Sequence, residues 1–241
     1  MRLDPDPWLG GLFGCAVYRA HWSTKAPSPE ALRRVVGEGT AFVYAKLPVR
    51  EVEGVGQLTG LGFKVVDINI SFEGPPAGPP PKGPAVRRAE AGDRDGVLAI
   101  AESCFEYSRF HLDPLVAPGL ADRIKRAWVE SYFDKKRGDL LLVAELDGRP
   151  AGFLAGLVAP VGGRPGWVID LMGVDRGAQR RGVGASLVRW FSHLACGQAE
   201  VMGVGTQVAN TPSMGLYASC GFRPAGAAYV LHAHLREGKA R

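Results

Sequence analysis

The sequence predicts an α/β fold, in which a mixed β-sheet carries helices on both faces and follows a smaller β/α domain. The chain has 241 residues, of which 46% are hydrophobic and 22% are charged, as in ordinary globular proteins. Short apolar segments with the alternating pattern of strands are interspersed with amphipathic helical segments along its whole length. Residues 74–84, GPPAGPPPKGP, hold nine glycines and prolines in eleven positions. We therefore expect a small domain over 1–73, a linker over 74–84 and a larger domain over 85–241.

The amino-terminal segment is predicted to alternate strands with helices. Strand-like alternation falls at residues 13–20, 40–47 and 63–73. Ser28 and Pro29 are N-cap and first-turn signals for a helix, and residues 50–62 form a second helical segment that ends at glycine. This β-α-β-α-β order is short for an independent core, so we expect the segment to pack against its neighbour.

The larger domain is predicted to follow the order β-α-α-β-β-β-α-β-α-β-β. Predicted helices cover residues 93–105, 120–133, 182–195 and 211–220. Predicted strands cover residues 85–89, a hairpin at 139–158, then 166–174, 200–208 and a final strand pair at 222–235. The hairpin turns through Asp147 and Gly148, a dipeptide that favours tight β-turns. Strands interleaved with helices in this way predict a mixed sheet.

Charge and composition narrow the classes of partner. The formal net charge is +5, yet residues 1–73 carry eight basic and eight acidic side chains. The basic excess lies from Lys135 to the end, where there are thirteen basic and seven acidic side chains. Such a local excess suits a phosphorylated small ligand better than duplex nucleic acid, or it is simply a solvated surface. The four cysteines are far apart, the start resembles no signal peptide, and no apolar run would span a membrane. We expect a cytoplasmic protein that binds neither nucleic acid nor membrane, with a homodimer as one option.

Residues 166–195 have the pattern of an anion site. An apolar strand leads into a polar turn, and Gly182 and Gly184 then open an amphipathic helix. The first amides of a helix are unpaired and lie at its positive end, where glycines let a phosphate approach closely. Arg176, Arg180 and Arg181 add charge nearby. The alternative is that these glycines serve only helix packing. The sequence contains neither GxxxxGK[ST] nor GxGxxG here.

The six residues QRRGVG at 179–184 resemble the Q/R-x-x-G-x-G/A signature of the GNAT acetyltransferase superfamily. The preceding strand, the following helix, and Asn210 and Tyr217 ahead of Gly221-Phe222 also fit that superfamily over residues 85–235. The resemblance implies a GNAT fold, acetyl-CoA as cosubstrate and a pyrophosphate held at the turn. The implied coenzyme A-binding residues are Met172, Val174, Gln179, Arg180, Arg181, Gly182, Val183, Gly184, Ala185 and Asn210. Among them, the Met172 amide would polarise the thioester carbonyl, and the backbone around Val174 would pair with pantetheine.

Tyr217 is the catalytic candidate that the resemblance implies. Asn210 and Tyr217 are seven residues apart, so on a helix they differ by roughly 20° in direction and share one face. In the superfamily such a tyrosine protonates the departing thiolate as general acid. The alternative is an ordinary packed aromatic before a turn glycine.

Other patches are similar to the dTDP-fucosamine acetyltransferase group. They are GFKVVDINISFE, the loop Ser108-Arg109-Phe110, VGTQVANT and AAYVLH. The likeness implies N-acetylation of a nucleotide-linked amino sugar, with Ser108 and Arg109 bordering the acceptor cleft. Arg109 would pair with a substrate phosphate, or it forms a structural salt bridge. An aminoglycoside, a polyamine, a protein amine and a non-catalytic acyl-CoA-binding module remain as alternatives.

The general base is less clearly marked. Relatives carry a glutamate at the position of Val168, and Asp170 lies two residues further on the same strand face. Asp170 is therefore the candidate base, against a structural or amine-binding carboxylate and against deprotonation by solvent. His232 and His234 share a strand face, but no third ligand is evident, so we predict no metal. Core packing is the default expectation for Trp128 and Tyr132.

Overall fold

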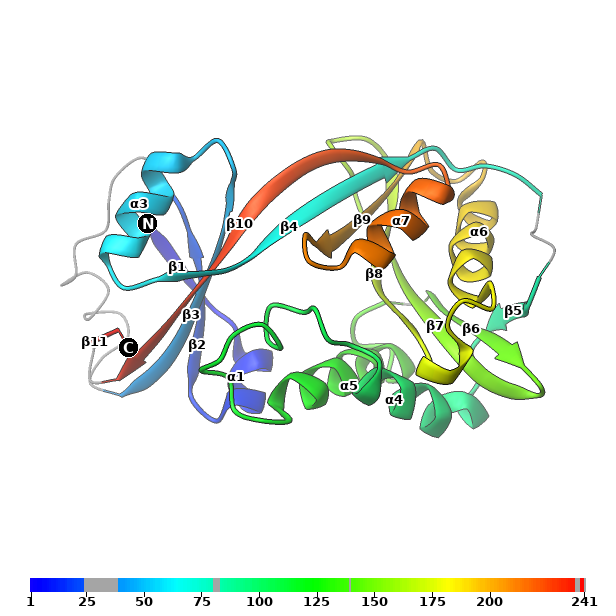
Figure 1. Cartoon of the computed structure of the whole chain (residues 1–241), viewed down its shortest axis with the longest axis horizontal. Coiled ribbons are helices and arrows are strands. Elements are labelled where there is room, and N and C mark those ends of the chain that lie inside the picture. The colour runs from blue at the N-terminus through cyan, green and yellow to red at the C-terminus, as the bar shows by residue number, and fades with distance from the viewer. Residues whose placement is uncertain (24–38, 80–82, 139, 237–238, 241) are drawn as a thin grey trace.

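The computed structural model describes residues 1–23, 39–79, 83–138, 140–236 and 239–240. In this part of the chain, one mixed sheet of eleven strands is flanked by six α-helices (Figure 1). The strands pair in the order β1-β2-β3-β10-β4-β9-β8-β7-β6-β5, and β11 pairs with β10. None of the described helices is long and apolar enough to cross a bilayer. The structure thus has the predicted fold class.

The element bounds follow most of the predicted pattern. The strands are β1 Arg2–Pro5, β2 Ala16–His21, β3 Thr40–Pro48, β4 Lys64–Gly74, β5 Ala85–Arg88, β6 Leu140–Leu146, β7 Arg149–Val158, β8 Gly166–Val174, β9 Val201–Gln207, β10 Arg223–Arg236 and β11 Lys239–Ala240. The helices are α1 Pro7–Phe13, α3 Val52–Gly60, α4 Arg94–Ser103, α5 Leu120–Phe133, α6 Val183–Ala195 and α7 Thr211–Ser219. The helix predicted after Ser28 and Pro29 lies outside the described residues.

Helix α1 is an element that the sequence pattern did not predict. The Asp6 side chain accepts a hydrogen bond from the Leu9 amide (3.0 Å), Pro7 occupies the first turn, and Gly14 ends the helix with φ 69°. These are ordinary capping signals. They frame only seven residues, too few for a helical period to be recognised, and the strand expected from Phe13 begins at Ala16 instead.

The helices pack on both faces of the sheet, and strand β6 shows why. Its residues Leu140, Leu142 and Ala144 belong to the core against α6, whereas Leu141 and Val143 belong to the core against α4 and α5. Successive side chains of a strand point to opposite faces, so a continuous apolar run is buried on both sides. The predicted two-sided sheet is confirmed.

Strand β10, near the end of the sequence, pairs with strands of the amino-terminal segment. It pairs with β3 on one side and β4 on the other, and its residues Leu231, Ala233 and Leu235 complete the core of the amino-terminal segment. The expected strand pair over 222–235 is therefore one long strand, whose pairing with β4 shifts in register at Gly226 and again at Leu231 without a turn. The division into two domains stays a prediction, but the segments share one sheet.

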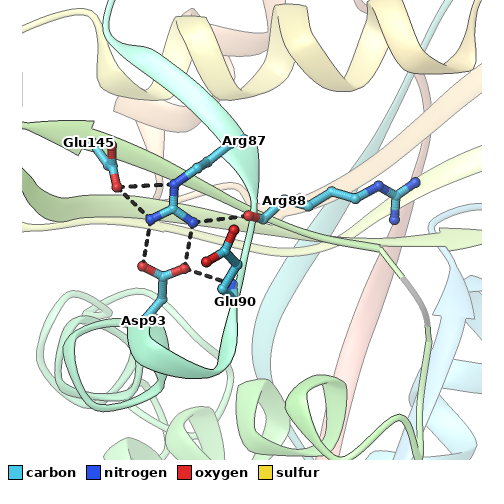
Figure 2. Close-up of polar contacts among 5 residues, drawn as sticks. All are labelled: Arg87, Arg88, Glu90, Asp93 and Glu145. Atoms are coloured by element: carbon cyan, nitrogen blue, oxygen red, sulfur yellow. Dashed lines mark hydrogen bonds and ion pairs between the residues drawn. The ribbon is translucent and has the colours of Figure 1, made fainter.

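Polar contacts fix the start of the larger segment. Arg87 on β5 forms a bidentate pair with Asp93 (2.7 and 2.9 Å) and also bonds Glu145 on β6 (Figure 2). The Asp93 carboxylate also accepts from the Glu90 amide (2.7 Å) as part of a capping box. This network ties β5, β6 and the beginning of α4 together.

Candidate active site

Strands β8 and β9 are paired over only four residues each and then separate. Their parallel pairing ends at Ile169 and Val204. Beyond it, β8 continues to Val174 beside β7, and β9 continues to Gln207 beside β4. Asp170 is the extra residue of a β-bulge where β8 turns away. The separated strands form a wedge in which two cavities lie.

The backbone of β8 offers donors to this wedge. The Asp175 amide donates to the Ala151 carbonyl on β7 at 2.9 Å. Because successive residues of a strand direct their amides to opposite sides, the amides of Met172 and Val174 point away from β7, towards the wedge. Both residues line the larger cavity.

The turn after β8 forms the start of α6. Gly182 is its N-cap with φ 83°, and Arg180 also has a left-handed φ of 60°. The first helical hydrogen bond runs from the Ser186 amide to the Gly182 carbonyl, so the amides of the first turn have no helical partner. A Cβ on Gly184 would lie 3.1 Å from Leu216 of α7, so this glycine also serves helix packing. A turn of this kind, with unpaired backbone amides at a helix start, can form a cradle for an anion.

A cavity of about 740 Å³ extends from this turn along the wedge. Ten of the predicted site residues line it, namely Ser108, Met172, Val174, Gln179, Arg180, Gly182, Val183, Gly184, Ala185 and Asn210. Arg181 does not line this cavity; its guanidinium pairs with Asp147 at 3.5 Å. Arg176 lines the cavity and pairs with Glu106 at 2.8 Å.

A second cavity of about 410 Å³ adjoins the first. The two share the lining residues Phe105, Ser108, Met172, Gln207, Asn210 and Ser213. Its other walls come from β2, β3 and β4 of the amino-terminal segment and from α5, β8, β9, β10 and α7. The amino-terminal segment thus supplies one side of the smaller cavity.

Asn210 and Tyr217 both line the smaller cavity. Asn210 is the N-cap of α7 and accepts from the Ser213 amide at 3.3 Å. Tyr217 is 5% exposed, and its ring lies 6.0 Å from those of Phe72 and Phe222. Burial raises the pKa of Tyr217, so the hydroxyl is protonated at neutral pH. That hydroxyl has no hydrogen-bond partner among the described residues. Its proton is therefore available to a ligand, while packing holds the ring in place.

Asp170 is held by four hydrogen bonds. Its carboxylate accepts from Trp128 Nε1 (2.8 Å), from the Tyr132 hydroxyl (2.6 Å), and from Arg137 Nε and Nη2 (2.6 and 3.1 Å). Burial raises the pKa of Asp170, but these donors outweigh it, so the pKa lies below its usual value. A carboxylate held in its charged form is a weak base. Trp128 and Tyr132, expected to serve packing alone, are hydrogen-bond donors to this carboxylate.

Arg109 lies between two aromatic rings in the smaller cavity. Its guanidinium carbon is 4.1 Å from the Tyr44 ring centre and 4.3 Å from that of Phe110. Its Nη1 lies 3.3 Å from His232 Nε2, and His232 Nδ1 lies 2.7 Å from Asp113 Oδ2. Burial lowers the pKa of His232 to about 4, so the neutral ring donates to Asp113 and accepts from Arg109. Arg109 forms no ion pair within the described part of the chain, contrary to the salt-bridge alternative.

The third partner of the two histidines is Asp113. Its Oδ2 accepts from His232 and from His234 Nε2 (2.8 Å), and the three ligand atoms lie within 4.8 Å of one another. Such a group is large enough for a cation, but direct hydrogen bonds already join its members. These bonds tie β10 to the loop between α4 and α5. The absence of a metal stays a prediction.

The sequence did not predict five charged residues that line the smaller cavity: Arg19, Lys46, Asp67, Lys125 and Arg137. Lys125 is 8% exposed beside the rings of Phe105 and Trp128, and burial lowers its pKa to about 8. Asp67 is 7% exposed, and neither of its oxygens receives a hydrogen bond within the described residues. Asp67 alternates with Asn69 and other polar residues along β4, a pattern that indicates a solvated face.

Comparison with known proteins gives the class of this site. The sequence pattern of the acetyltransferase (GNAT) family matches residues 98–222, which include both separated strands and the α6 turn. The chain belongs to this family.

Particular relatives are more distant. The chain is 25% identical over 144 residues to the spore coat polysaccharide biosynthesis protein SpsD of Bacillus subtilis, a match that covers 59% of this chain and 48% of SpsD. It therefore spans about half the length of the curated relative that it matches.

Solved structures share the fold. A GCN5-related N-acetyltransferase from Sphaerobacter thermophilus superposes with a TM-score of 0.58 at 16% identity, over 83% of this chain and 61% of that one. A GCN5-related N-acetyltransferase from Kribbella flavida has a TM-score of 0.56 at 16% identity, over 90% of this chain and 80% of that one.

Proposed function

We propose that the protein transfers the acetyl group of acetyl-CoA to the primary amine of a nucleotide-linked amino sugar. The observation that carries this proposal is the pair of joined cavities. The larger ends at a backbone cradle for an anion, and the smaller is lined by four cations that have no carboxylate partner among the described residues. These cations are Arg19, Lys46, Arg109 and Lys125.

The larger cavity fits coenzyme A in chemistry. The amides from Gly182 to Ala185 and the side chains of Gln179 and Arg180 would bind the pyrophosphate. The β8 backbone around Val174 would pair with pantetheine, and Asn210 would contact the same ligand from α7. The φ of 83° at Gly182 favours glycine, which has no side chain that would enter the cradle.

The joined end of the cavities is where the acetyl group would be transferred. Bound acetyl-CoA supplies an activated acetyl thioester. The Met172 amide donates a hydrogen bond to the carbonyl oxygen that becomes negative as the amine attacks. Tyr217 gives its hydroxyl proton to the sulfur as the carbon–sulfur bond breaks, and solvent returns a proton to the tyrosine. No covalent enzyme intermediate is needed.

The acceptor is inferred from charge. Four cations against a single unpaired carboxylate, Asp67, among the described residues of this cavity suit a molecule that carries several negative charges and one amine. A nucleotide diphosphate linked to an amino sugar has this distribution. Arg109 and Ser108 border the acceptor cavity, and Ser108 also lies at the joined end. The polysaccharide role in the name of SpsD supports a sugar substrate.

Two matched glycine variants test the cradle. Gly182→Glu places a side chain and a negative charge in it, whereas Gly197→Glu introduces the same residue at a similar left-handed φ of 76° with open space around it. We expect Gly182→Glu to weaken acetyl-CoA binding by ~3 kcal/mol, about 100-fold, through steric exclusion and repulsion, and Gly197→Glu to leave it unchanged. Calorimetry with both folded variants measures this. Equal acetyl-CoA affinities of the two variants would show that the pyrophosphate does not bind at this turn.

The reaction is tested by following coenzyme A release with dTDP-fucosamine, with a polyamine and with an acetylatable peptide. Turnover with dTDP-fucosamine supports the proposal. Turnover with only the polyamine or the peptide would overturn the proposed acceptor. No coenzyme A release with any of the three would favour a non-catalytic acyl-CoA-binding module.

A further inference from the structure

Asp67 occupies a defined place in the smaller cavity. On three adjacent strands, Lys46 of β3 pairs with Val230 of β10, and Val230 pairs with Asp67 of β4, so the three residues form one row across the sheet. All three line the cavity. Strand β9 pairs with β4 only as far as Asn69, so Asp67 lies just beyond the edge of that pairing. Its carboxylate thus belongs to the wall that the amino-terminal segment provides.

The Asp67 carboxylate has no hydrogen-bond partner among the described residues. Neither oxygen is exposed, although the side chain as a whole is 7% exposed. Lys46 lies two strands away in this row, but its side chain reaches across β10 to β4. Its ammonium bonds Asn69 Oδ1 (2.5 Å), and Asn69 in turn donates to the Thr206 carbonyl (3.1 Å). The cation of this row is therefore hydrogen-bonded to Asn69 and not to Asp67, and a buried carboxylate without a protein partner calls for a water, an ion or a ligand to satisfy it.

The other carboxylate of this cavity cannot take that ligand. Asp170 already accepts four hydrogen bonds, two of them from Arg137. Among the described carboxylates that line the cavity, only Asp67 can therefore accept new hydrogen bonds without losing existing ones. An alkylammonium has three donors and one positive charge, which matches a carboxylate with two free oxygens.

We infer that Asp67 binds the ammonium of the acceptor and removes its proton before acetyl transfer, an inference that rests on the proposed function. One ammonium proton passes to the Asp67 carboxylate, and the nitrogen lone pair then forms a bond to the thioester carbon. The carbon–sulfur bond breaks, and sulfur takes the Tyr217 proton. The nitrogen loses a second proton to solvent, which restores Tyr217. Asp67 releases its proton to solvent when the amide product leaves, so the transfer gives amide, thiol and one proton.

The electrostatics of the cavity suit this role. Burial raises the pKa of Asp67 to about 6, against smaller lowering effects of the Ile68 amide and Lys46. A base should have a pKa near the working pH, and this one is charged at neutral pH. The other charged groups that line the cavity are Arg19, Lys46, Arg109, Lys125, Arg137 and Asp170, and burial raises the pKa of Tyr44 and Tyr217. Lys125, with a pKa of about 8, remains charged where Asp67 titrates.

The test compares Asp67→Asn with the wild type, and with Asp95→Asn as an aspartate control outside both cavities. With dTDP-fucosamine as acceptor, we expect kcat/KM to fall about 10²-fold or more in Asp67→Asn and to be unchanged in Asp95→Asn. The wild-type kcat/KM should rise with pH through an apparent pKa near 6. In Asp67→Asn this acidic limb should vanish. Its kcat/KM should instead rise with pH through the pKa of the acceptor amine itself. Acetyl-CoA affinity should stay the same.

A binding readout separates a role in recognition from a structural one. We expect the wild type loaded with coenzyme A to bind dTDP-fucosamine at least ~10-fold more tightly than dTDP-fucose, which has hydroxyl in place of amine. Asp67→Asn should lose this preference. A variant that keeps both the preference and the acidic limb would overturn the inference while leaving the proposed function intact. If the wild type acetylates no nucleotide sugar, the proposed acceptor fails, and the role of Asp67 fails with it.

Discussion

The unpartnered Asp67 carboxylate should make the protein less stable as pH rises. Its ordinary pKa is 3.8, and burial raises it to about 6 in the folded protein. An acid with a raised folded pKa binds its proton more tightly in the folded state. Folding is therefore opposed by its ionisation, fully above the folded pKa and hardly at all below the unfolded one. Asp67→Asn removes this titration with little change in shape.

The size of the effect follows from these two pKa values. Their separation corresponds to about 3 kcal/mol at pH 8, falling to about 1.5 kcal/mol near pH 5 and about 0.5 kcal/mol near pH 4. Asp67 is 7% exposed and both carboxylate oxygens are buried, so solvent screening reduces the effect only slightly. The amide that Asp67→Asn introduces would also be buried without partners, which shifts the whole curve but not its dependence on pH. The free energy of unfolding of Asp67→Asn minus that of the wild type should therefore increase by about 2.5 kcal/mol from pH 4 to pH 8.

Urea unfolding followed by the fluorescence of the five tryptophans measures this quantity. The free energy of unfolding would be determined for the wild type, Asp67→Asn and Asp95→Asn across the pH range. We expect Asp67→Asn to gain stability relative to the wild type as pH rises, and Asp95→Asn to run parallel to the wild type. Parallel curves for Asp67→Asn would refute the reasoning, because Asp67 would then have the same pKa in both states.

Two further substitutions test the cavity residues. Tyr217→Phe keeps the packed ring and removes the proton, so turnover should fall ~10²- to 10⁴-fold with unchanged acetyl-CoA affinity. Tyr229→Phe, outside both cavities, is the control, and near-normal turnover of Tyr217→Phe would mean that the thiolate takes its proton from water. Arg109→Ala should raise the Michaelis constant for the sugar nucleotide ~10- to 100-fold, the loss of one charge-assisted hydrogen bond, and leave that for acetyl-CoA unchanged. The exposed Arg223→Ala is its control, and equal changes in both constants would place Arg109 in a structural role.

Local signals in the sequence were sufficient to predict the elements around the α6 turn, where we propose that coenzyme A binds. The strand at 166–174, the glycine-bearing turn and the amphipathic helix after it are contiguous, so their order alone brings the backbone donors together. Capping glycines and hydrophobic periods act over a few residues, which is why α5 and α6 were predicted nearly to the residue. Asn210 and Tyr217 are likewise placed by one short helix.

The acceptor side depends on contacts between distant residues. Lys46, Asp67 and Lys125 come from three separate elements, and only the pairing of β10 between β3 and β4 places the first two in one row. Alternation along β4 put Asp67 on the polar face, but no local rule states that a cavity, not bulk water, covers that face. The four hydrogen bonds to Asp170 also come from three residues beyond its own strand. The sequence by itself determined the strand, the turn and the helix start of the proposed cosubstrate cradle, because helix starts and strand ends are local. Tertiary structure alone decided which carboxylate is satisfied and which is free, because burial and pKa depend on neighbours that the chain order does not name.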